Sequence, residues 1–411
     1  MVLDSGGAPR REAEIGPGEL AWSFNHLDPA VAETAYETMG RIRRGCPVAR
    51  SGELDGFVLV TGYDEIREAA QASDRFSAYV DGLGAAAVVT EMREAVAPMF
   101  ETDDDHHHQW RRTLMDFFTP AAAAAQDQYV RAICRETLQE MIPRGAADLV
   151  SGYTRQVPPL VIGRMLGLAE LERAWLSEHV RALYSAETLL EAQQIGRVYA
   201  DFLLGQIRER RARPGRDLLS CMVAAEVDGR IANEEELVKM TMLMVAAGHL
   251  TTADACATAV LQLLENPALR ERVTALPVLL EPFVEELVRH EPAVAATGRT
   301  VTTHTHLGGL TLEPGDRLLL AWGSANRDER RFDDGDVFRL DRDRSRTPHL
   351  GWGSGEHRCL GRHLARVELR VMLDELLRAI PDFQLQPHAT VRRTFGVIRG
   401  VATLPVQWSR R

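Results

Sequence analysis

Apolar residues recur at three- and four-residue spacing over much of this chain, which is the pattern of amphipathic helices. The longest such region covers residues 127–206 and is interrupted near Pro158 and Gly167. The pattern returns at residues 234–265, and residues 243–256 within it are apolar almost all round. A helix with that composition is buried on every side. The sequence therefore predicts a central helix of roughly 30 residues, about 45 Å long at 1.5 Å per residue.

Segments with β-strand character are shorter and scattered. They are rich in β-branched and large apolar residues, as strands are. They cover residues 57–61, 299–301, 310–312, 318–322 and 395–408. Residues 1–19 are polar and contain glycine and proline, so we expect a loose tail there, followed by a folded region over residues 20–411. The predicted fold class is mainly α with a small β part.

The composition narrows the range of partners. The chain has 48 Lys and Arg residues against 59 Asp and Glu residues, a formal net charge of −11. This charge disfavours nucleic acid or an anionic membrane as a partner. The 5 cysteines are widely spaced and odd in number, which fits a reducing compartment without a disulfide framework. Neither a signal-peptide core nor a run of 18 apolar residues occurs in the sequence, so we expect a soluble cytoplasmic protein.

Residues 349–368, with the sequence HLGWGSGEHRCLGRHLARVE, carry the most distinctive chemistry. Gly351, Gly353 and Gly355 alternate with other residues, and glycines at this density let a backbone turn tightly or approach a flat ligand closely. Cys359 follows, and a helical pattern begins immediately after it. A thiolate at a helix N-terminus is stabilised by the helix dipole, which suits a nucleophile or a metal ligand. No second cysteine lies nearby in the sequence, so a tetrahedral zinc site is not supported.

This stretch resembles the haem-binding loop of the cytochrome P450 family, in which a single cysteinate is the axial iron ligand. The family pattern is an aromatic residue, Gly, x, Gly, x, His or Arg, x, Cys, x, Gly. The residues that occupy it in order are Trp352, Gly353, Gly355, His357, Cys359 and Gly361. A glycine-rich turn around a buried cysteine would explain the glycines but not the positions of Trp352 and His357. The resemblance implies that Cys359 ligates the iron of haem b, that Trp352 and Gly353 border the cofactor, and that the fold is a single-domain cytochrome P450 fold.

Residues 103–108 read Asp-Asp-Asp-His-His-His and invite a metal-site interpretation. Adjacent residues point in different directions on any regular element, so three consecutive histidines cannot all meet one ion. In the resembled family, a His four residues before an Arg, ahead of a Phe-Thr-Pro stop, contacts a haem propionate. His107 and Arg111 match that spacing, and the resemblance adds Arg299 and His357 as further propionate-binding residues. The forked donor set of arginine suits paired carboxylates.

The central predicted helix carries the sequence AGHLTT at its middle. Glycine inside a helix costs about 0.5–1 kcal/mol relative to alanine, so we expect a ligand, or alternatively another helix, to approach closely there. The resembled family has an Ala/Gly-Gly-x-acid-Thr element that passes over the haem and delivers protons during catalysis. Ala247, Gly248 and Thr251 match it, but Leu250 stands where the acid is expected. Protons would then come through Thr251, Thr252, water or the substrate itself.

Further features concern the framework and the redox partners. Glu286 and Arg289 lie about one turn apart and match the family's Glu-x-x-Arg pair, which is structural.

Since no reductase-like segment is found, the resemblance implies separate electron donors, namely a ferredoxin and its reductase. A basic face around the cysteine helix suits an acidic redox partner, although a solvated helix face is the alternative. It consists of Arg358, Arg362, Arg366 and Arg370.

The resemblance as a whole implies a haem-thiolate monooxygenase that oxidises a hydrophobic organic small molecule, of secondary metabolism or xenobiotic origin, with dioxygen. We expect a mostly apolar pocket built from residues 78–97, a helix pair in residues 174–209, the central helix and the turn at Phe395. Leu250 leaves two alternatives open. One is an oxidative coupling enzyme or peroxygenase in natural-product biosynthesis, and the other is a non-catalytic haem-thiolate sensor.

Overall fold

The computed structural model describes residues 15–81, 83–85, 97, 99–185 and 188–409. Helices dominate it, as predicted, and the α-helices are α1 (Pro17–Trp22), α2 (Ala35–Gly45), α3 (Tyr63–Gln71), α4 (Asp104–Leu114), α5 (Pro120–Ala124), α6 (Asp127–Met141), α7 (Val157–Met165), α8 (Glu170–Ser185), α9 (Leu189–Ala212), α10 (Leu218–Val223), α11 (Glu234–Glu265), α12 (Pro267–Ala275), α13 (Leu280–His290), α14 (Trp322–Ala325) and α15 (Arg362–Ala379). Turns of 3-10 helix lie at Pro29–Val31, Met115–Phe118, Ile142–Arg144 and Pro277–Leu279, and a π-helical turn, η5, lies at Val150–Thr154. Helix α1 begins inside the segment predicted to be a loose tail, because Pro17 occupies an N-terminal helix position that suits its fixed φ.

The strands form small sheets, in keeping with the short β-rich runs of the sequence. The largest is a 5-stranded sheet in the order β1-β2-β12-β9-β3, made of β1 (Val48–Ser51), β2 (Phe57–Val60), β12 (Arg317–Leu320), β9 (Thr297–Val301) and β3 (Phe76–Ser77). Strand β12 runs parallel to β2, with Leu319 opposite Leu59, and the other pairs are antiparallel. The smaller sheets pair β13 (Gln384–Leu385) and β6 (Ala146–Asp148) with β16 (Pro405–Gln407), β14 (Arg392–Thr394) with β15 (Gly400–Thr403), β10 (Thr305–Leu307) with β11 (Leu310–Leu312), β4 (Tyr79–Val80) with β5 (Gly84–Ala85), and β7 (Glu226–Val227) with β8 (Arg230–Ile231).

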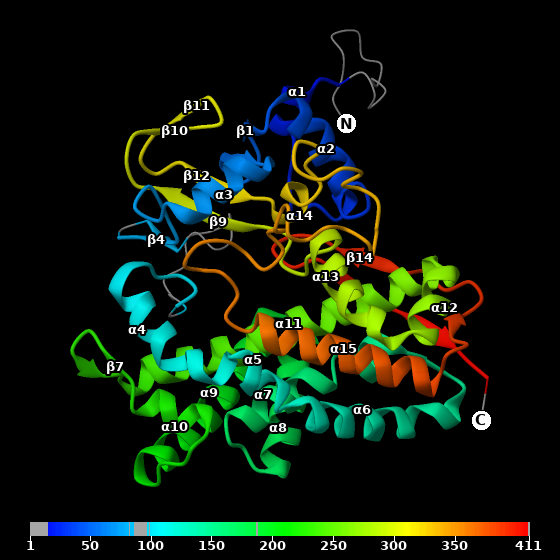
Figure 1. Ribbon diagram of the computed structural model, residues 1–411. Helices are drawn as coiled ribbons and strands as arrows, with labels where there is room; N and C mark the ends of the chain where they lie inside the picture. The colour runs from blue at the N-terminus through cyan, green and yellow to red at the C-terminus, as the bar shows by residue number, and fades with distance from the viewer. Residues whose placement is uncertain (1–14, 82, 86–96, 98, 186–187, 410–411) are drawn as a thin grey trace.

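Two hydrophobic cores hold these elements together. The helical core is built largely on α6, α7, α11 and α15. Tyr153 of η5 and Leu373 of α15 are fully buried in it. The sheet core is built on the largest sheet with α2 and α3, and it buries Leu59 and Ile66. Figure 1 shows the corresponding division, with the large sheet and α1 to α3 in one part and α5 to α11 with α15 in the other.

Helix α11 runs through the helical part and has the bounds that the apolar pattern predicts. It starts with a capping box, in which Asn233 accepts from the Glu236 backbone N–H and the Glu236 side chain accepts from the Asn233 N–H. By length and composition, α11 is the one helix of the described chain that could cross a membrane, but 67% of its most apolar window is buried inside the protein. Its apolar surface therefore serves the core.

Candidate functional site

A cavity of about 270 Å³ lies between α11 and the cysteine loop, residues 349–361, that precedes α15. Its lining is largely apolar and includes Leu243 and Met244 from α11 and Val294 from the segment before β9. The cavity also brings together every residue predicted for the site, which are Ala247, Gly248, Thr251 and Thr252 of α11, His107 and Arg111 of α4, Arg299 of β9, and Trp352, Gly353, His357 and Cys359 of the cysteine loop. Residues far apart in the sequence thus face one space.

The glycines of the cysteine loop are required by their surroundings. Gly353 and Gly355 have φ values of +73° and +70°, which side chains rarely adopt. A Cβ on Gly355 would lie 2.2 Å from the backbone oxygen of Ala70, and one on Gly351 would lie 2.1 Å from that of Val288. The neighbouring backbone therefore leaves no room for side chains, and the loop is fixed against both the sheet part and α13.

The backbone of the same loop positions Cys359. Its N–H donates to the carbonyl of Trp352 at 2.8 Å, which closes the turn beneath the sulfur. Helix α15 begins at Arg362, a few residues later than predicted, with Gly361 as its N-cap. Burial raises the pKa of the Cys359 thiol, against the opposing effects of the Gly361 N–H and the Arg362 cation. The protein alone therefore favours the neutral thiol, and a thiolate here calls for a bound metal cation.

Two arginines supply positive charge at the cavity. Arg299 is 6% exposed and donates to the backbone oxygen of Gly298 at 2.7 Å, and no carboxylate of the described residues lies within ion-pair distance of it. Arg111 donates to the backbone oxygen of Arg358 at 2.6 Å. Both guanidinium groups have N–H donors beyond these bonds, and burial lowers the pKa of each. The arrangement suits an anionic partner inside the cavity.

The two predicted histidines line the cavity and also make contacts with protein atoms. His357 Nε2 lies 2.7 Å from Asp103 Oδ1. Although burial opposes it, hydrogen bonds from His357 and Ser77 lower the pKa of Asp103 to about 2, while burial lowers that of His357 to about 4. The neutral ring donates Nε2–H to the carboxylate, which leaves Nδ1 without a proton. The bond to Asp103 therefore occupies Nε2, and the contact of His357 with a propionate stays a prediction.

His107 is also engaged by protein atoms. Its Nδ1 lies 2.8 Å from the backbone oxygen of Met99, and its Nε2 lies 3.2 Å from that of Glu356. The rings of His107 and His357 are in contact, with centroids 4.3 Å apart. His107 therefore ties α4 to the cysteine loop. The side chains of the histidine run have separate partners, since His106 pairs with Asp228 and His108 pairs with Glu356.

The α11 wall of the cavity has few polar groups. The Thr251 hydroxyl donates to the carbonyl of Ala247 at 2.8 Å. A Cβ on Gly248 would meet Ile162 at 3.5 Å, an ordinary contact, so close packing of another helix does not explain this glycine. Its open side faces the cavity. His249 is buried, and burial lowers its pKa to about 4.

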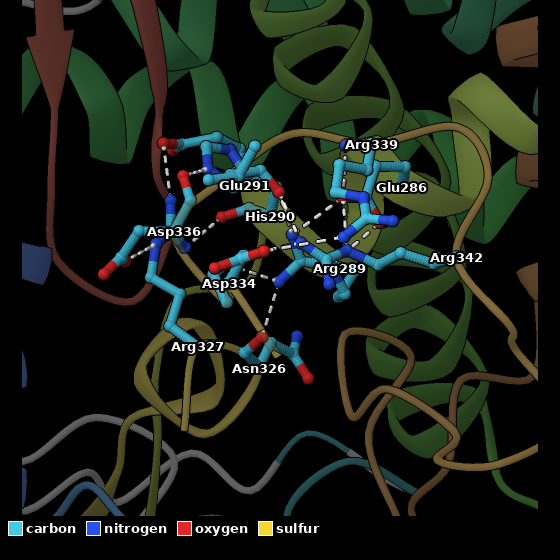
Figure 2. Close-up of polar contacts among 12 residues, drawn as sticks. Glu286, Arg289, His290, Glu291, Asn326, Arg327, Asp334, Asp336, Arg339 and Arg342 are labelled. Atoms are coloured by element: carbon cyan, nitrogen blue, oxygen red, sulfur yellow. Dashed lines mark hydrogen bonds and ion pairs between the residues drawn. The ribbon is translucent and has the colours of Figure 1, made fainter. Parts of the chain in front are cut away.

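A polar network beside the cysteine loop contains the predicted Glu-x-x-Arg pair. Figure 2 shows Arg289 directed at Glu286, which accepts from it at 2.8 Å, and Arg342 approaching the same carboxylate at 2.9 Å. Arg289 also donates to the carbonyls of Asn326 and Gly335. The Asn326 side chain in turn accepts from the Leu350 N–H at 2.6 Å, at the start of the cysteine loop. The pair is buried and structural, as predicted.

The basic face on the cysteine helix is partly neutralised. Arg366 is paired with Glu285 at 2.5 Å, and Arg370 is paired with Asp127. Arg358 is exposed, and Arg362 donates to the carbonyl of Cys359 at 3.1 Å. The excess positive charge is therefore concentrated near the start of α15.

Some features of the site were not predicted. Glu368 lines the cavity, is 2% exposed, and burial raises its pKa well above the usual value. The one sequence signal is a carboxylate inside the apolar stripe of the cysteine helix. Asp103 was assigned no role, because its partner His357 is 254 positions away.

The predicted pocket walls are confirmed only in part. Helix α11 lines the cavity, but neither α8, α9 nor Phe395 contributes a described residue to the lining. Phe395 instead packs edge-on against Tyr36. Within the predicted segment 78–97, residues 82 and 86–96 lie outside the described residues.

These residues fit a haem. Cys359 offers a sulfur ligand, Arg111 and Arg299 offer donors to carboxylates, and Gly248 leaves the opposite wall open. Trp352 Nε1 is buried without a hydrogen-bond partner in the described chain. A flat, largely apolar group with an iron centre and carboxylate substituents matches this donor set.

Comparison with known proteins supports the same assignment. Residues 275–405 match the family model for cytochrome P450. The methyl-branched lipid omega-hydroxylase of Mycobacterium tuberculosis is 33% identical over 98% of this chain and 97% of its own length. The mycinamicin IV hydroxylase/epoxidase of Micromonospora griseorubida is 35% identical over 68% of this chain and 71% of its own length.

Solved structures also support the assignment to the cytochrome P450 family. A mutant of the mixed-function P450 MycG in complex with mycinamicin IV superposes with a TM-score of 0.83 at 30% identity, covering 94% of this chain and 99% of its own. The hydroxylase HmtN of himastatin biosynthesis gives a TM-score of 0.80 at 28% identity, covering 89% and 94%. The predicted fold class is confirmed, and the enzyme interpretation is favoured over the sensor. The chain belongs to the cytochrome P450 family of haem-thiolate monooxygenases.

Proposed function

We propose that this protein inserts oxygen into a hydrophobic organic small molecule of secondary metabolism or xenobiotic origin. It uses haem b, dioxygen, and electrons from a ferredoxin and its reductase, and it works in the cytoplasm without a nucleic-acid or membrane partner. The observation that carries the proposal is the cavity, in which Cys359 and Thr251 line one largely apolar space.

The residues of the cavity have different roles in binding the cofactor. Cys359 would hold the haem iron through its sulfur, and Trp352 and Gly353 would border the cofactor, since all three line the cavity. Arg111 and Arg299 would hold the propionates, while His107 ties α4 to the cysteine loop and His357 ties that loop to Asp103. The haem, when bound, supplies the dioxygen chemistry.

On the opposite wall, α11 residues serve the reaction. Ala247 and Gly248 keep this side of the cavity free of bulk. Thr251 holds a hydroxyl group at the cavity through its bond to the Ala247 carbonyl, and Thr252 places a second hydroxyl beside it. These hydroxyls can hold water and pass protons.

The substrate is apolar because the lining is apolar. Phe100, Leu243, Met244, Val288 and Ala293 contribute side chains to it. Two relatives are named for a methyl-branched lipid and for mycinamicin IV, which supports a large, mainly hydrophobic molecule. Compounds that bind in the cavity should shift the absorption of the bound haem, and a screen for this shift would identify them.

The electron donor docks near the start of α15. Arg358 is exposed there, and Arg362 lies beside the carbonyl of Cys359. Because Arg366 and Arg370 are already paired with acids, they contribute less to an acidic partner than predicted. An acidic ferredoxin complements the remaining charge.

The carbon monoxide difference spectrum of the reduced protein tests the core of the proposal. The wild type should give the red-shifted Soret band of thiolate ligation, and Cys359→Ala should lose it completely. Cys221→Ala is the control, because Cys221 is half-buried and does not line the cavity. A band that survives in Cys359→Ala, or its absence in the wild type, contradicts the proposal.

A second candidate is a peroxygenase or an oxidative coupling enzyme, which the apolar Leu250 favours. Hydrogen peroxide brings its own protons, so such an enzyme does not need a proton relay on α11. Product formed with peroxide but without any electron donor, at a rate equal to the ferredoxin-driven rate or above it, would favour this candidate.

A further inference from the structure

Helix α11 carries a carboxylate, Asp254, one turn away from the position where the acid is missing. Asp254 lies one turn after Leu250 and three residues after Thr251. Side chains three or four residues apart on a helix are neighbours, with Cβ atoms about 5–6 Å apart. At 100° per residue, Asp254 points between the directions of Leu250 and Thr251. Asp254 itself does not line the cavity, but its helical neighbour Thr251 does.

The surrounding structure makes room for this carboxylate. Asp254 is 6% exposed. A Cβ on Gly400 of strand β15 would lie 2.5 Å from Asp254 Cγ, so the carboxylate fills space that the strand leaves free. No described residue donates a hydrogen bond to it. A buried carboxylate without a hydrogen-bond donor lowers the stability of the folded protein. Asp254 is therefore more easily explained by a role in function than by a role in stability.

Arg155 connects Asp254 to the surface. This residue directly follows η5, and its Nη2 lies 3.8 Å from Asp254 Oδ1. The Arg155 side chain is 32% exposed. From β15, Gly400 presents no charged group to Asp254, and on α11 itself His249 interacts with the backbone of Arg155. Arg155 is thus the cation that faces the Asp254 carboxylate, and part of the Arg155 side chain is exposed to solvent.

The acid is also suited to exchange protons. Burial, opposed by Arg155, raises the pKa of Asp254 to about 6. Near neutral pH both of its protonation states are then populated, which is the condition for efficient proton transfer. A neutral amide in its place could fill the same space but could not carry a proton.

We propose that Asp254, with Arg155, replaces the missing acid at position 250 and carries protons from solvent to Thr251. The proposal rests on the monooxygenase function proposed above. That reaction consumes dioxygen, two electrons from the ferredoxin, two protons and a C–H bond, and it yields C–OH and water. Asp254 gives its proton to the Thr251 hydroxyl, or to water held there, as that hydroxyl passes a proton into the cavity. It then takes a proton back from solvent at Arg155.

The first test uses the haem-loaded enzyme with a surrogate ferredoxin, its reductase, NADPH and dioxygen, without an organic substrate. Dioxygen then ends as hydrogen peroxide or, with two more electrons and two more protons, as water. We expect Asp254→Asn to slow NADPH oxidation by about tenfold to a hundredfold and to shift the product toward peroxide. Leu250→Asp in the Asp254→Asn background should restore most of the rate and the water yield.

Two variants separate this relay from simpler explanations. Asp374→Asn removes another buried carboxylate that is paired with arginines, and it should leave the peroxide fraction unchanged. Glu368→Gln removes the acid that lines the cavity directly. An unchanged Asp254→Asn enzyme, a loss that Leu250→Asp fails to restore, or the same loss in Glu368→Gln alone overturns the proposal.

A second measurement does not depend on turnover. Infrared difference spectra of the resting protein, between about pH 5 and about pH 8, should show a carboxylic acid band that titrates near the pKa of about 6 and is missing in Asp254→Asn. A wild type without that band overturns the relay even if the enzyme is active. Failure of the carbon monoxide spectrum, with the band present, would instead overturn the proposed function.

Discussion

Both walls of the cavity carry glycines, but for different reasons. In the cysteine loop, Gly351 and Gly355 are enclosed by the backbone of neighbouring segments, so the protein itself excludes side chains. In α11, a Cβ on Gly248 would make only an ordinary contact with Ile162. The loop glycines are therefore explained by the polypeptide alone. Gly248 is explained by the ligand that the cavity would hold. The cysteine loop therefore sets the geometry of the cavity, and α11 leaves space for the ligand.

The largest effect is expected on the loop side. Gly351→Ala places a Cβ 2.1 Å from the Val288 carbonyl oxygen, and α13 cannot move away without disturbing its buried ion pair. We expect the free energy of unfolding to fall by about 1–3 kcal/mol, measured by urea denaturation. Gly361→Ala is the matched control, since nothing lies within 4 Å of a Cβ there. Equal destabilisation in the two variants would contradict the explanation.

The second effect concerns the buried carboxylate of Asp254 and its influence on the free energy of unfolding. Asp254 has a pKa of about 6 in the folded protein against an ordinary value of 3.8, so the native state binds more protons between these values. Stability therefore falls as the pH rises through this window, and the full penalty is present above about pH 6. Asp254→Asn removes the penalty.

We expect Asp254→Asn to raise the free energy of unfolding by about 1–2 kcal/mol at about pH 8, with the gain vanishing toward about pH 4. Denaturation curves at several pH values measure it. A gain that is independent of pH would show that the substitution acts through packing rather than through the carboxylate.

The smallest effect is expected at the helix glycine. Gly248→Ala should stabilise the haem-free protein by about 0.5–1 kcal/mol through helix propensity, because the protein leaves room for the methyl group. In the haem-loaded protein the gain should be lost, since the methyl group enters the cavity. Gly205→Ala in α9, where nothing lies within 4 Å of a Cβ, should stabilise both forms. Equal gains from Gly248→Ala in both forms would contradict a ligand at this wall.

The sequence predicted what depends on local pattern. The bounds of α11 follow from apolar periodicity and a capping box, and the cysteine loop follows from glycines at fixed spacing from Cys359. The residues predicted for the site meet at one cavity because the motif that suggested them reflects a shared ligand. What could not be predicted depends on distant partners. The pairing of Asp103 with His357 and the acids that neutralise Arg366 and Arg370 arise only from the tertiary fold.

The position of the cavity has a consequence for folding. Trp322 belongs to the sheet core, whereas Ile162 and Leu364 belong to the helical core, and all three line the cavity. A group bound there contacts both cores at once, so its binding free energy is lost when either core unfolds. The cofactor would then act as a cooperativity element, because it adds a contact that the two cores share.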